Sequence, residues 1–343
     1  MLIRAGLEGI SLTHAGAFWR KAAGRGLIFT LHHVRPAAPQ LTQANMLLTV
    51  TPAFLEQAIQ TCLKAGLTPL ALRDLPERLS DTRDRHTYVC FTLDDGYRDN
   101  ERFAAPVFQK YAVPYTIFVT AGFVERTRSM WWETLEALLA RERAVDFDFG
   151  NGLQRFRVDT AARKSFVFDR FAEFIEQSDE DEAVARIDAY ARKCGLDPLS
   201  LVDDLTLDAN DLVRLVRDPL AQIGAHSMTH VNLKRVDDDR LKQEIAGSAD
   251  AVERYIGVRP STFAYPYGFA SAVGAREITA AEDAGFSLAV TNKPGMLQAD
   301  CLNQPTNLNR VSLNGTYQRK RYVEALLTGI PFKLREAGGA NLL

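Results

Sequence analysis

Short apolar runs that alternate with amphipathic helical patterns constrain the fold of this chain most strongly. Runs rich in β-branched and aromatic residues, each the length of a buried strand, lie at residues 26–34, 67–71, 88–93, 114–120, 220–225, 262–265, 287–291 and 308–313. Helical patterns lie between most of them, for example after Thr51-Pro52, where Thr suits the N-cap and Pro the first helical position. Alternation of this kind predicts an α/β fold with a parallel sheet and helices outside it.

Residues 125–215 interrupt the alternation. They contain the run Trp131-Trp132 at a helix start, a hairpin signal at Asn151-Gly152, and two or three charged amphipathic helices. We interpret this segment as a mostly helical insertion. The expected division is an N-terminal segment over residues 1–25, the α/β domain over residues 26–124 and 216–330, the insertion, and a C-terminal tail over residues 331–343. Within the tail, residues 337–340 are expected to be mobile.

Composition excludes several classes of partner. The 343 residues carry a formal net charge of −2, which gives no reason to expect nucleic acid or an anionic membrane surface. Four scattered cysteines without a Cys-x-x-Cys spacing indicate free thiols in a reducing compartment. No secretory signal pattern and no apolar run of ~20 residues is found. We therefore expect a cytoplasmic protein without a transmembrane segment, acting on a neutral substrate.

Two adjacent carboxylates end the strand predicted at residues 88–93. Asp94 and Asp95 precede Gly96, whose backbone freedom lets both side chains turn into one pocket. Two such anions repel unless a cation or a shared proton separates them. Taken alone, the pair is equally well explained by one Asp capping the helix that begins near Asp99 while the other is solvated.

Two histidines four residues apart, His226 and His230, follow the strand predicted at residues 220–225. On one side of a helical turn or a tight loop, this spacing suits a single metal ion. A lone His-x-x-x-His arises easily by chance. Its conjunction with Asp94-Asp95-Gly96 at a second strand end favours a metal site.

Three motifs together make the sequence resemble the polysaccharide deacetylase family, also called the NodB-homology or carbohydrate esterase 4 family. Residues 92–96 match the family's Thr-Phe-Asp-Asp-Gly, with Leu93 in the Phe place, and residues 226–230 match His-Ser/Thr-x-x-His. Residues 263–268, Phe-Ala-Tyr-Pro-Tyr-Gly, are similar to a variant of its third motif. The resemblance implies a deformed (β/α)7, TIM-like barrel.

The resemblance also implies residue roles. It makes Asp95, His226 and His230 the ligands of one divalent metal ion and Asp94 the general base. Three protein ligands leave coordination positions open, which is typical of a catalytic metal site. This ligand set suits Zn²⁺, and Co²⁺, Ni²⁺ or Mn²⁺ are compatible with it.

The expected general acid is His32. No histidine follows His230, so the family's C-terminal Leu-x-x-x-x-His motif, which supplies the acid, is missing from its usual place. Members of the circularly permuted branch, such as bacterial exopolysaccharide-adhesin deacetylases, carry this motif near the N-terminus, where His32 and His33 end the first strand. Adjacent strand residues face opposite ways, so only one should enter the pocket, and His33 is the substitute. Alternatively, both are packing or surface residues.

The third motif is expected to form one pocket wall with Tyr265, Pro266 and Tyr267, although Pro-Tyr-Gly is also a strand-ending turn. By resemblance, the Tyr267 N–H stabilises an oxyanion. Ala264 stands where the commoner motif has Arg. Arg310, at another strand end, is a candidate to approach Asp94 instead, or else an ordinary surface ion-pair residue.

Trp131 and Trp132 are candidates for stacking on sugar rings, although anchoring the insertion to the barrel explains them better. The expected function is metal-dependent hydrolysis of N-acetyl groups on N-acetylglucosamine-type oligo- or polysaccharides, that is, a hydrolase acting on non-peptide C–N bonds. O-deacetylation or hydrolysis of a non-sugar amide by the same site is a second hypothesis. A non-catalytic carbohydrate-binding protein is a third, and the intact Asp94, Asp95, His226 and His230 argue against it.

Overall fold

The fold is an α/β barrel built on one parallel sheet. A computed structural model describes residues 23–37, 42–298 and 300–338, so the predicted N-terminal segment lies almost wholly outside the described residues. The strands of the sheet are β1 (Gly26–Leu31), β4 (Thr68–Pro69), β5 (Tyr88–Leu93), β6 (Tyr115–Val119), β9 (Ala221–Ala225), β10 (Thr262–Ala264), β11 (Leu288–Val290) and β12 (Val311–Ser312). Their order is β11-β10-β9-β6-β5-β1-β12, with β4 pairing beside β5, and all pairs are parallel.

The sheet curls so that its two edges approach each other. A parallel bridge joins Val290 in β11 to Leu308, just ahead of β12. Side chains alternate along each strand: in β5, Val89, Phe91 and Leu93 pack against outer helices, whereas Cys90 faces the barrel interior. Strands covered on both faces are expected to be apolar throughout. The predicted α/β, deformed-barrel fold is confirmed.

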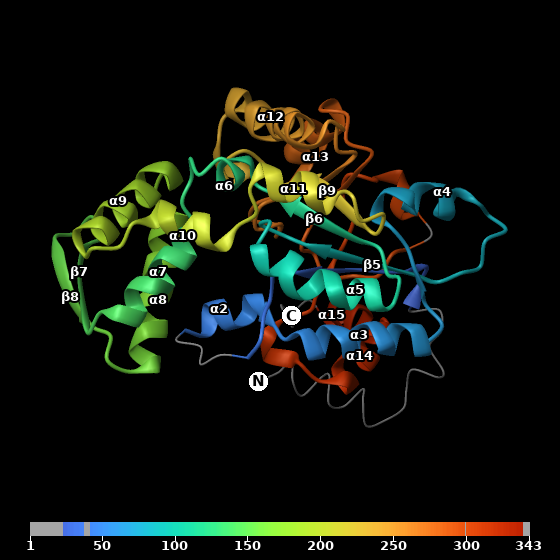
Figure 1. Cartoon of the computed structure of the whole chain (residues 1–343), viewed down its shortest axis with the longest axis horizontal. Helices are drawn as coiled ribbons and strands as arrows, with labels where there is room; N and C mark the ends of the chain where they lie inside the picture. The colour runs from blue at the N-terminus through green and yellow to red at the C-terminus, as the bar shows by residue number, and fades with distance from the viewer. Residues whose placement is uncertain (1–22, 38–41, 299, 339–343) are drawn as a thin grey trace.

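Helices cover the outside of the sheet. They are α3 (Pro52–Lys64), α4 (Leu75–Ser80), α5 (Ala105–Lys110), α6 (Ala121–Val124), α11 (Ala209–Leu215), α12 (Asp238–Ile256), α13 (Ala275–Asp283), α14 (Lys320–Leu327) and α15 (Ile330–Gly338). In Figure 1, α12 and α13 lie above the sheet and α3, α14 and α15 below it. The predicted start of α3 is confirmed, because the Thr51 side chain accepts the Phe54 N–H and Pro52 opens the helix.

The segment between α6 and α11 forms a lobe to the left of the barrel in Figure 1. It contains α7 (Trp131–Arg141), β7 (Ala144–Asp148), β8 (Leu153–Arg157), α8 (Ala161–Gln177), α9 (Glu180–Lys193) and α10 (Pro198–Leu205). β7 and β8 form the hairpin that Asn151-Gly152 predicts. A hydrophobic cluster of its own, which includes Trp132, Phe147 and Phe171, holds the lobe together.

Three local expectations are wrong in detail. The run at residues 26–34 is not one strand, because it breaks at His32 and continues as β2 (His33–Val34), which pairs with β3 (Thr49–Val50). The helix expected over residues 99–111 begins with a π-helical turn, η4 (Asn100–Ala104). The expected C-terminal tail is helical through Gly338 as α15, and its last residues lie outside the described residues.

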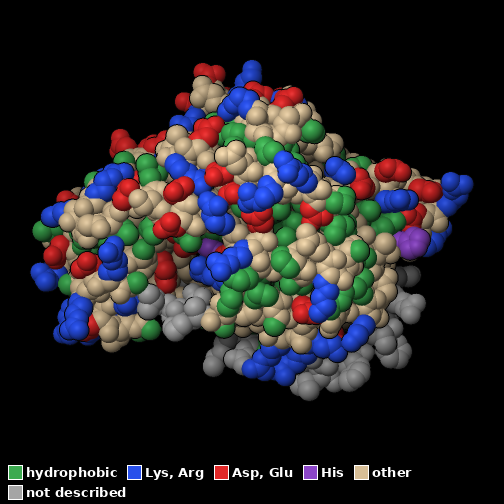
Figure 2. Space-filling model, viewed as in Figure 1, with side chains coloured by type: hydrophobic (Ala, Val, Ile, Leu, Met, Phe, Trp, Pro, Cys, Tyr) green, Lys and Arg blue, Asp and Glu red, His purple; other side chains and the backbone are tan. Residues whose placement is uncertain are grey.

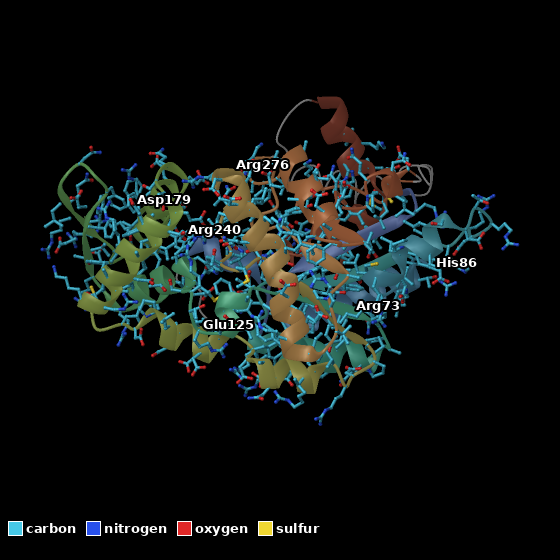
Figure 3. All side chains as sticks on the ribbon, turned by 90° about the horizontal axis from the view of Figure 1, so that it is seen from above. Arg73, His86, Glu125, Asp179, Arg240 and Arg276 are labelled. Carbon is cyan, nitrogen blue, oxygen red and sulfur yellow. The ribbon has the colours of Figure 1, made fainter. Side chains whose placement is uncertain are left out.

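The surface carries charges of both signs. Figure 2 shows Lys and Arg interspersed with Asp and Glu over the visible face, which agrees with the near-zero net charge. Seen from above, Asp179 lies in the lobe and His86 near the opposite end of the molecule (Figure 3). Among the described residues, no helix combines the length and hydropathy that crossing a membrane requires. All four cysteines are free, and Cys62 and Cys90 are buried.

Candidate active site

The carboxyl end of β5 supplies both carboxylates of the site. Asp94 and Asp95 are buried, with 1% and 3% of their surface exposed. Asp95 has a left-handed backbone, with φ of 71°, and Gly96 follows with φ of 68°. This turn breaks the alternation of the strand, so that both side chains point into the barrel mouth.

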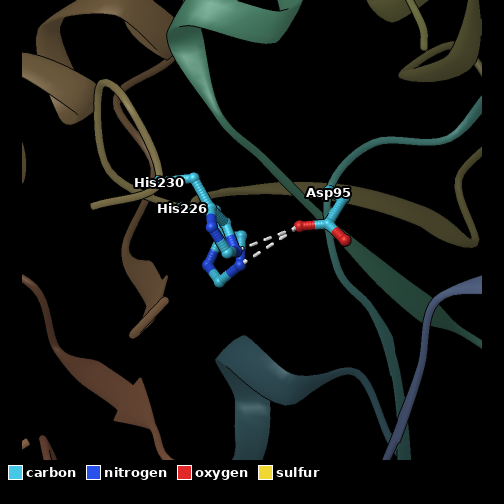
Figure 4. Close-up of side chains that lie close together, drawn as sticks. All are labelled: Asp95, His226 and His230. Atoms are coloured by element: carbon cyan, nitrogen blue, oxygen red, sulfur yellow. Dashed lines mark ion pairs between the residues drawn. The ribbon is translucent and has the colours of Figure 1, made fainter. Parts of the chain in front are cut away.

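Asp95, His226 and His230 form one compact cluster. The Nε2 atoms of His226 and His230 lie 3.5 and 3.4 Å from Asp95 Oδ1 (Figure 4). Ligands that each bind one ion at about 2 Å are separated by roughly 3 to 4 Å, so the cluster has the dimensions of a metal site. The histidines lie on a tight loop after β9, where Ser227 and His230 have positive φ, and not on a helix. The structure therefore brings the three predicted ligands together.

Hydrogen bonding around the cluster fits a bound cation. The His226 Nδ1–H donates to the Ala264 carbonyl oxygen at 2.7 Å, which leaves the Nε2 lone pair facing Asp95. Asp95 Oδ1 is buried and accepts no hydrogen bond. A buried carboxylate oxygen without a donor is costly unless a cation binds it, so the chemistry of these residues fits a divalent metal ion.

Electrostatics keep two of the three ligands, His230 and Asp95, in metal-binding forms. Burial acts to lower the pKa of the third, His226, but the carboxylates of Asp95 and Asp94 outweigh it and raise this pKa. Burial lowers the pKa of His230 to about 3, against the opposing charges of Asp95 and Asp94, so its ring is neutral. Burial acts to raise the pKa of Asp95, but the nearby imidazole rings of His226 and His230 outweigh it, and this pKa lies below its ordinary value. A neutral imidazole and a charged carboxylate are the forms that bind metals.

Asp94 is held by Arg310. Arg310 Nη1 donates to Asp94 Oδ1 at 2.7 Å and Nη2 donates to Oδ2 at 2.6 Å, with both side chains buried. Arg310 also donates to the Thr291 carbonyl and to Thr92 Oγ1. Burial raises the pKa of Asp94, but the charge of Arg310 outweighs it and lowers this pKa overall. Arg310 is thus no surface residue: it orients Asp94 and keeps it ionised.

The two N-terminal histidines have different surroundings. His32 is half-buried and lines the same cavity as Asp94 and Asp95. Burial lowers the pKa of His32, although Asp95 and Asp94 oppose the shift. His33 is fully buried away from the cavity, with Nδ1 2.5 Å from Asp99 and Nε2 3.3 Å from Glu133. This arrangement favours His32 over His33 as the acid, an assignment that stays a prediction.

The third motif lies only partly in the cavity. Tyr267 lines it, with a left-handed backbone at φ of 60°, and its N–H makes no hydrogen bond among the described residues. Tyr265 instead points into the core, where its hydroxyl donates to the Thr306 carbonyl at 2.9 Å. Neither Tyr265 nor Pro266 lines the cavity, so the structure does not place them at a substrate.

Trp131 and Trp132 anchor the lobe and also border the cavity. They belong to the hydrophobic cluster of the lobe and are at most 8% exposed, yet both line the cavity. The Trp131 indole N–H donates to the Tyr267 hydroxyl at 3.2 Å, and the Trp132 N–H donates to the Tyr97 hydroxyl at 2.9 Å. Little ring face is therefore free for stacking.

One residue near the site was not predicted from the sequence. Glu180, at the start of α9, is buried and accepts a hydrogen bond from the Tyr267 hydroxyl at 2.6 Å and from the Asn232 N–H at 2.9 Å. Burial raises the pKa of Glu180. In the sequence it belongs to the acidic run Asp179 to Glu182, which has the ordinary pattern of a helix N-terminus, so nothing marked it as special.

Comparisons with known proteins agree with this geometry. The sequence profile of the family described as polysaccharide deacetylase matches residues 81–151 and 183–289, just over half of the chain. No protein with a curated description matches the sequence significantly.

Several solved structures share the fold. The deacetylase PplD of Streptococcus pyogenes, in complex with acetate, is 16% identical with a TM-score of 0.58, over 88% of this chain and 97% of that one. A de-N-acetylase of Aggregatibacter actinomycetemcomitans is 11% identical with a TM-score of 0.53, over 87% and 98%. IcaB of Ammonifex degensii is 16% identical with a TM-score of 0.51, over 88% and 98%. Because the family profile spans more than half of the sequence, this chain belongs to the polysaccharide deacetylase family.

Proposed function

We propose that the protein removes N-acetyl groups from N-acetylglucosamine-type oligo- or polysaccharides by metal-dependent hydrolysis. One observation carries the proposal: a compact Asp-His-His cluster lies beside a second carboxylate that an arginine holds ionised. A cluster that only bound metal for structure would have no need of the second carboxylate. The family match supports an acetylated carbohydrate as the substrate.

The residues divide the work as follows. When bound by Asp95, His226 and His230, a divalent cation supplies a water of lowered pKa and polarises the amide carbonyl. Asp94, kept charged by Arg310, takes the proton of that water as general base. Which metal is bound is part of the proposal, and Zn²⁺ is our first choice for this ligand set.

Two further groups act on the reacting amide. The unused Tyr267 N–H donates a hydrogen bond to the carbonyl oxygen as negative charge develops on it. His32 donates a proton to the leaving amine, which otherwise departs as a poor leaving group. His33 cannot replace His32 as the acid, because its ring is buried and paired with Asp99 and Glu133. His32→Ala should therefore lower turnover strongly.

The proposal is tested by acetate release from chito-oligosaccharides, with and without a chelator. Asp95→Ala should lose bound metal and activity together, because it removes a ligand. Asp94→Asn should keep the metal and lose roughly 10²–10⁴-fold in turnover, because it removes only the base. Metal content by elemental analysis separates the two effects.

The controls distinguish this function from its alternatives. Acetylxylan in the same assay tests O-deacetylation, and faster release from it would contradict our assignment of the amide substrate. Near-full activity of Asp94→Asn would show that the base is misassigned. No release from any acetylated sugar, with metal present, would favour a non-catalytic protein.

A further inference from the structure

The catalytic cluster occupies only one end of a large cavity. A single cavity of about 620 Å³ contains Asp94, Asp95, His226 and His230 and extends from them past His32 toward α14 and α15. Sites of this size bury ligands of drug-like dimensions, so the cavity has room for more than the acetamido group and its sugar ring.

The far end of the cavity is walled by apolar side chains from four elements. We define the apolar wall as Phe54 on α3, Leu313 after β12, Val323 and Leu326 on α14, and Phe332 on α15. In Figure 1 these elements lie together below the sheet. Some polar groups nearby already make hydrogen bonds within the protein: the Asn314 side chain, for example, accepts a hydrogen bond from the Thr316 N–H at 3.1 Å. The wall itself carries no hydrogen-bonding side chain, although Ser312, Asn314 and Thr316 also line the cavity.

Two exposed apolar residues also line the cavity. Leu47, on α2 (Gln43–Leu48), is 47% exposed, and Phe269 is 57% exposed, and both line the cavity. Large apolar side chains are unfavourable at a water-filled entrance to a site for a polar ligand. α2 is held closely against η7 (Gly315–Tyr317), where a Cβ at Gly315 would lie only 1.9 Å from the Met46 carbonyl oxygen. The cavity entrance is thus a built feature.

The wall has no hydrogen-bonding side chain for a second sugar unit, and its two rings, Phe54 and Phe332, are at most 5% exposed. Sugars bind through hydrogen bonds and through stacking of their apolar faces on aromatic rings. Leu313, Val323 and Leu326 offer neither a ring face nor a polar group. A hydrocarbon chain, in contrast, gains free energy with every methylene that it places against such a surface.

We propose that the substrate is amphiphilic: its amide lies at the metal cluster while an attached hydrocarbon chain fills the cavity along the apolar wall. This inference rests on the proposed function, which supplies the position of the amide. The chain can come from two sources, as an alkyl or lipid group on the sugar or as a long N-acyl group in place of acetyl. Both present the same hydrocarbon to the same wall.

The experiment measures free-amine formation by the full-length metal-loaded protein on matched substrates. One arm compares methyl and octyl N-acetylglucosaminide, with the octyl compound below its micelle concentration. The other compares N-acetyl- and N-octanoylglucosamine. A buried methylene contributes about fourfold in affinity, so we expect kcat/KM to rise at least tenfold with chain length in one arm, and that arm identifies the source of the chain.

Variants localise the effect. Leu47→Glu places a charge at the entrance and should reduce the octyl preference at least fivefold, with little change for the methyl substrate. Leu63→Glu is the matched control, because Leu63 is also a half-exposed leucine, at 38%, and does not line the cavity. Leu326→Asn tests whether the buried end of the cavity contributes to the octyl preference. If Leu326→Asn does not fold, Leu47→Glu still decides the test.

Binding calorimetry separates this inference from the proposed function. Tighter binding of octyl than methyl glycoside, without any amine release, would support the chain site and contradict the deacetylase assignment. The opposite result would be amine release from the methyl glycoside or chito-oligosaccharides, with the octyl glycoside turned over and bound no better than the methyl one. That result would support the deacetylase assignment and contradict the chain site. Equal loss of octyl preference in Leu47→Glu and Leu63→Glu would also overturn the chain site.

Discussion

At the scale of single residues, the Asp94–Arg310 pair is the contact on which the chemistry of the site depends most directly. Both side chains are at most 1% exposed and are joined by two hydrogen bonds of 2.7 Å or less. Such a bidentate pair fixes the direction of the carboxylate as well as its charge. Lysine at this position would offer a point charge without that geometry.

Removing Arg310 should therefore destabilise the protein through the charge left behind. Arg310→Met is expected to lower the free energy of unfolding by roughly 3–5 kcal/mol, because Asp94 becomes a buried charge without a partner. The double variant Arg310→Met with Asp94→Asn should regain much of this loss while staying inactive. Urea unfolding of the wild type, the single variant and the double variant measures it, and equal stability of the single and double variants would contradict the explanation.

Arg259, which pairs with Asp250 and Glu253 at the surface, provides the control for that measurement. Its side chain is 43% exposed, and an exposed pair contributes only about 0–1 kcal/mol. Arg259→Met should therefore change the unfolding free energy little.

Single-residue prediction from the sequence succeeded where a motif and a strand end coincided. Asp95, His226 and His230 are brought together as predicted, because parallel strands β5 and β9 end at one edge of the sheet. Arg310 could be proposed only as one of two possibilities, since its contact spans 216 positions of sequence. Tyr265 was expected at the substrate, but its side chain points to the core face, which a strand-end motif alone does not specify.

At the scale of elements, α9 of the lobe supports the wall of the active site. Glu180 joins it to Tyr267 and to the Asn232 N–H, and Asp181 forms ion pairs with Arg128 at 2.7 Å and Arg240 at 3.3 Å. The first turn of α9 is thus one of the attachments of the lobe to the barrel.

Glu180→Ala should loosen this attachment. It removes the acceptor of two partly buried donors, the Tyr267 hydroxyl and the Asn232 N–H, which costs roughly 1–3 kcal/mol. We expect lower unfolding free energy and faster hydrogen exchange at Asn232, whereas Glu180→Gln should recover part of both. Glu182→Ala is the control from the same turn, because that side chain is exposed. An unchanged rate of hydrogen exchange at Asn232 in Glu180→Ala would show that α9 does not hold the loop that contains Asn232.

Elements were predicted well where sequence and local physics agree. The start of α3 follows from its capping residue, Thr51, and β5 follows from its apolar composition. The attachment of α9 could not be predicted, because an acidic first turn stabilises any helix and says nothing of what lies opposite. The domain boundaries proposed from the sequence stay a prediction.

At the scale of the whole molecule, His33 links the barrel to the lobe. Its ring lies between Asp99, near the end of β5, and Glu133 on α7, with the Tyr97 ring centred 3.5 Å away. Burial alone lowers the pKa of His33, but the two carboxylates outweigh it and raise this pKa to about 9. The protonated ring therefore stabilises the folded chain.

This pKa predicts how stability depends on pH. The folded pKa of about 9 exceeds the ordinary value of 6.5, so the stabilisation is full below pH 6.5 and is lost as pH rises through 9. Urea unfolding should show wild type exceeding His33→Gln by on the order of 3 kcal/mol at pH 6 and by much less at pH 9.5. The exposed His86 is the control, and a constant wild-type advantage at both pH values would contradict the assignment.

The left-handed backbone at the site has a consequence for the evolution of this protein. Asp95, Ser227, His230 and Tyr267 all hold positive φ, a conformation that costs a non-glycine residue about 1–3 kcal/mol. Selection for thermal stability alone would favour Gly or Asn at these positions, since either residue relieves the cost there. Variants chosen in that way would be more stable to heat than the parent protein but would lose residues of the active site. A search for a more stable form should therefore keep these four codons unchanged.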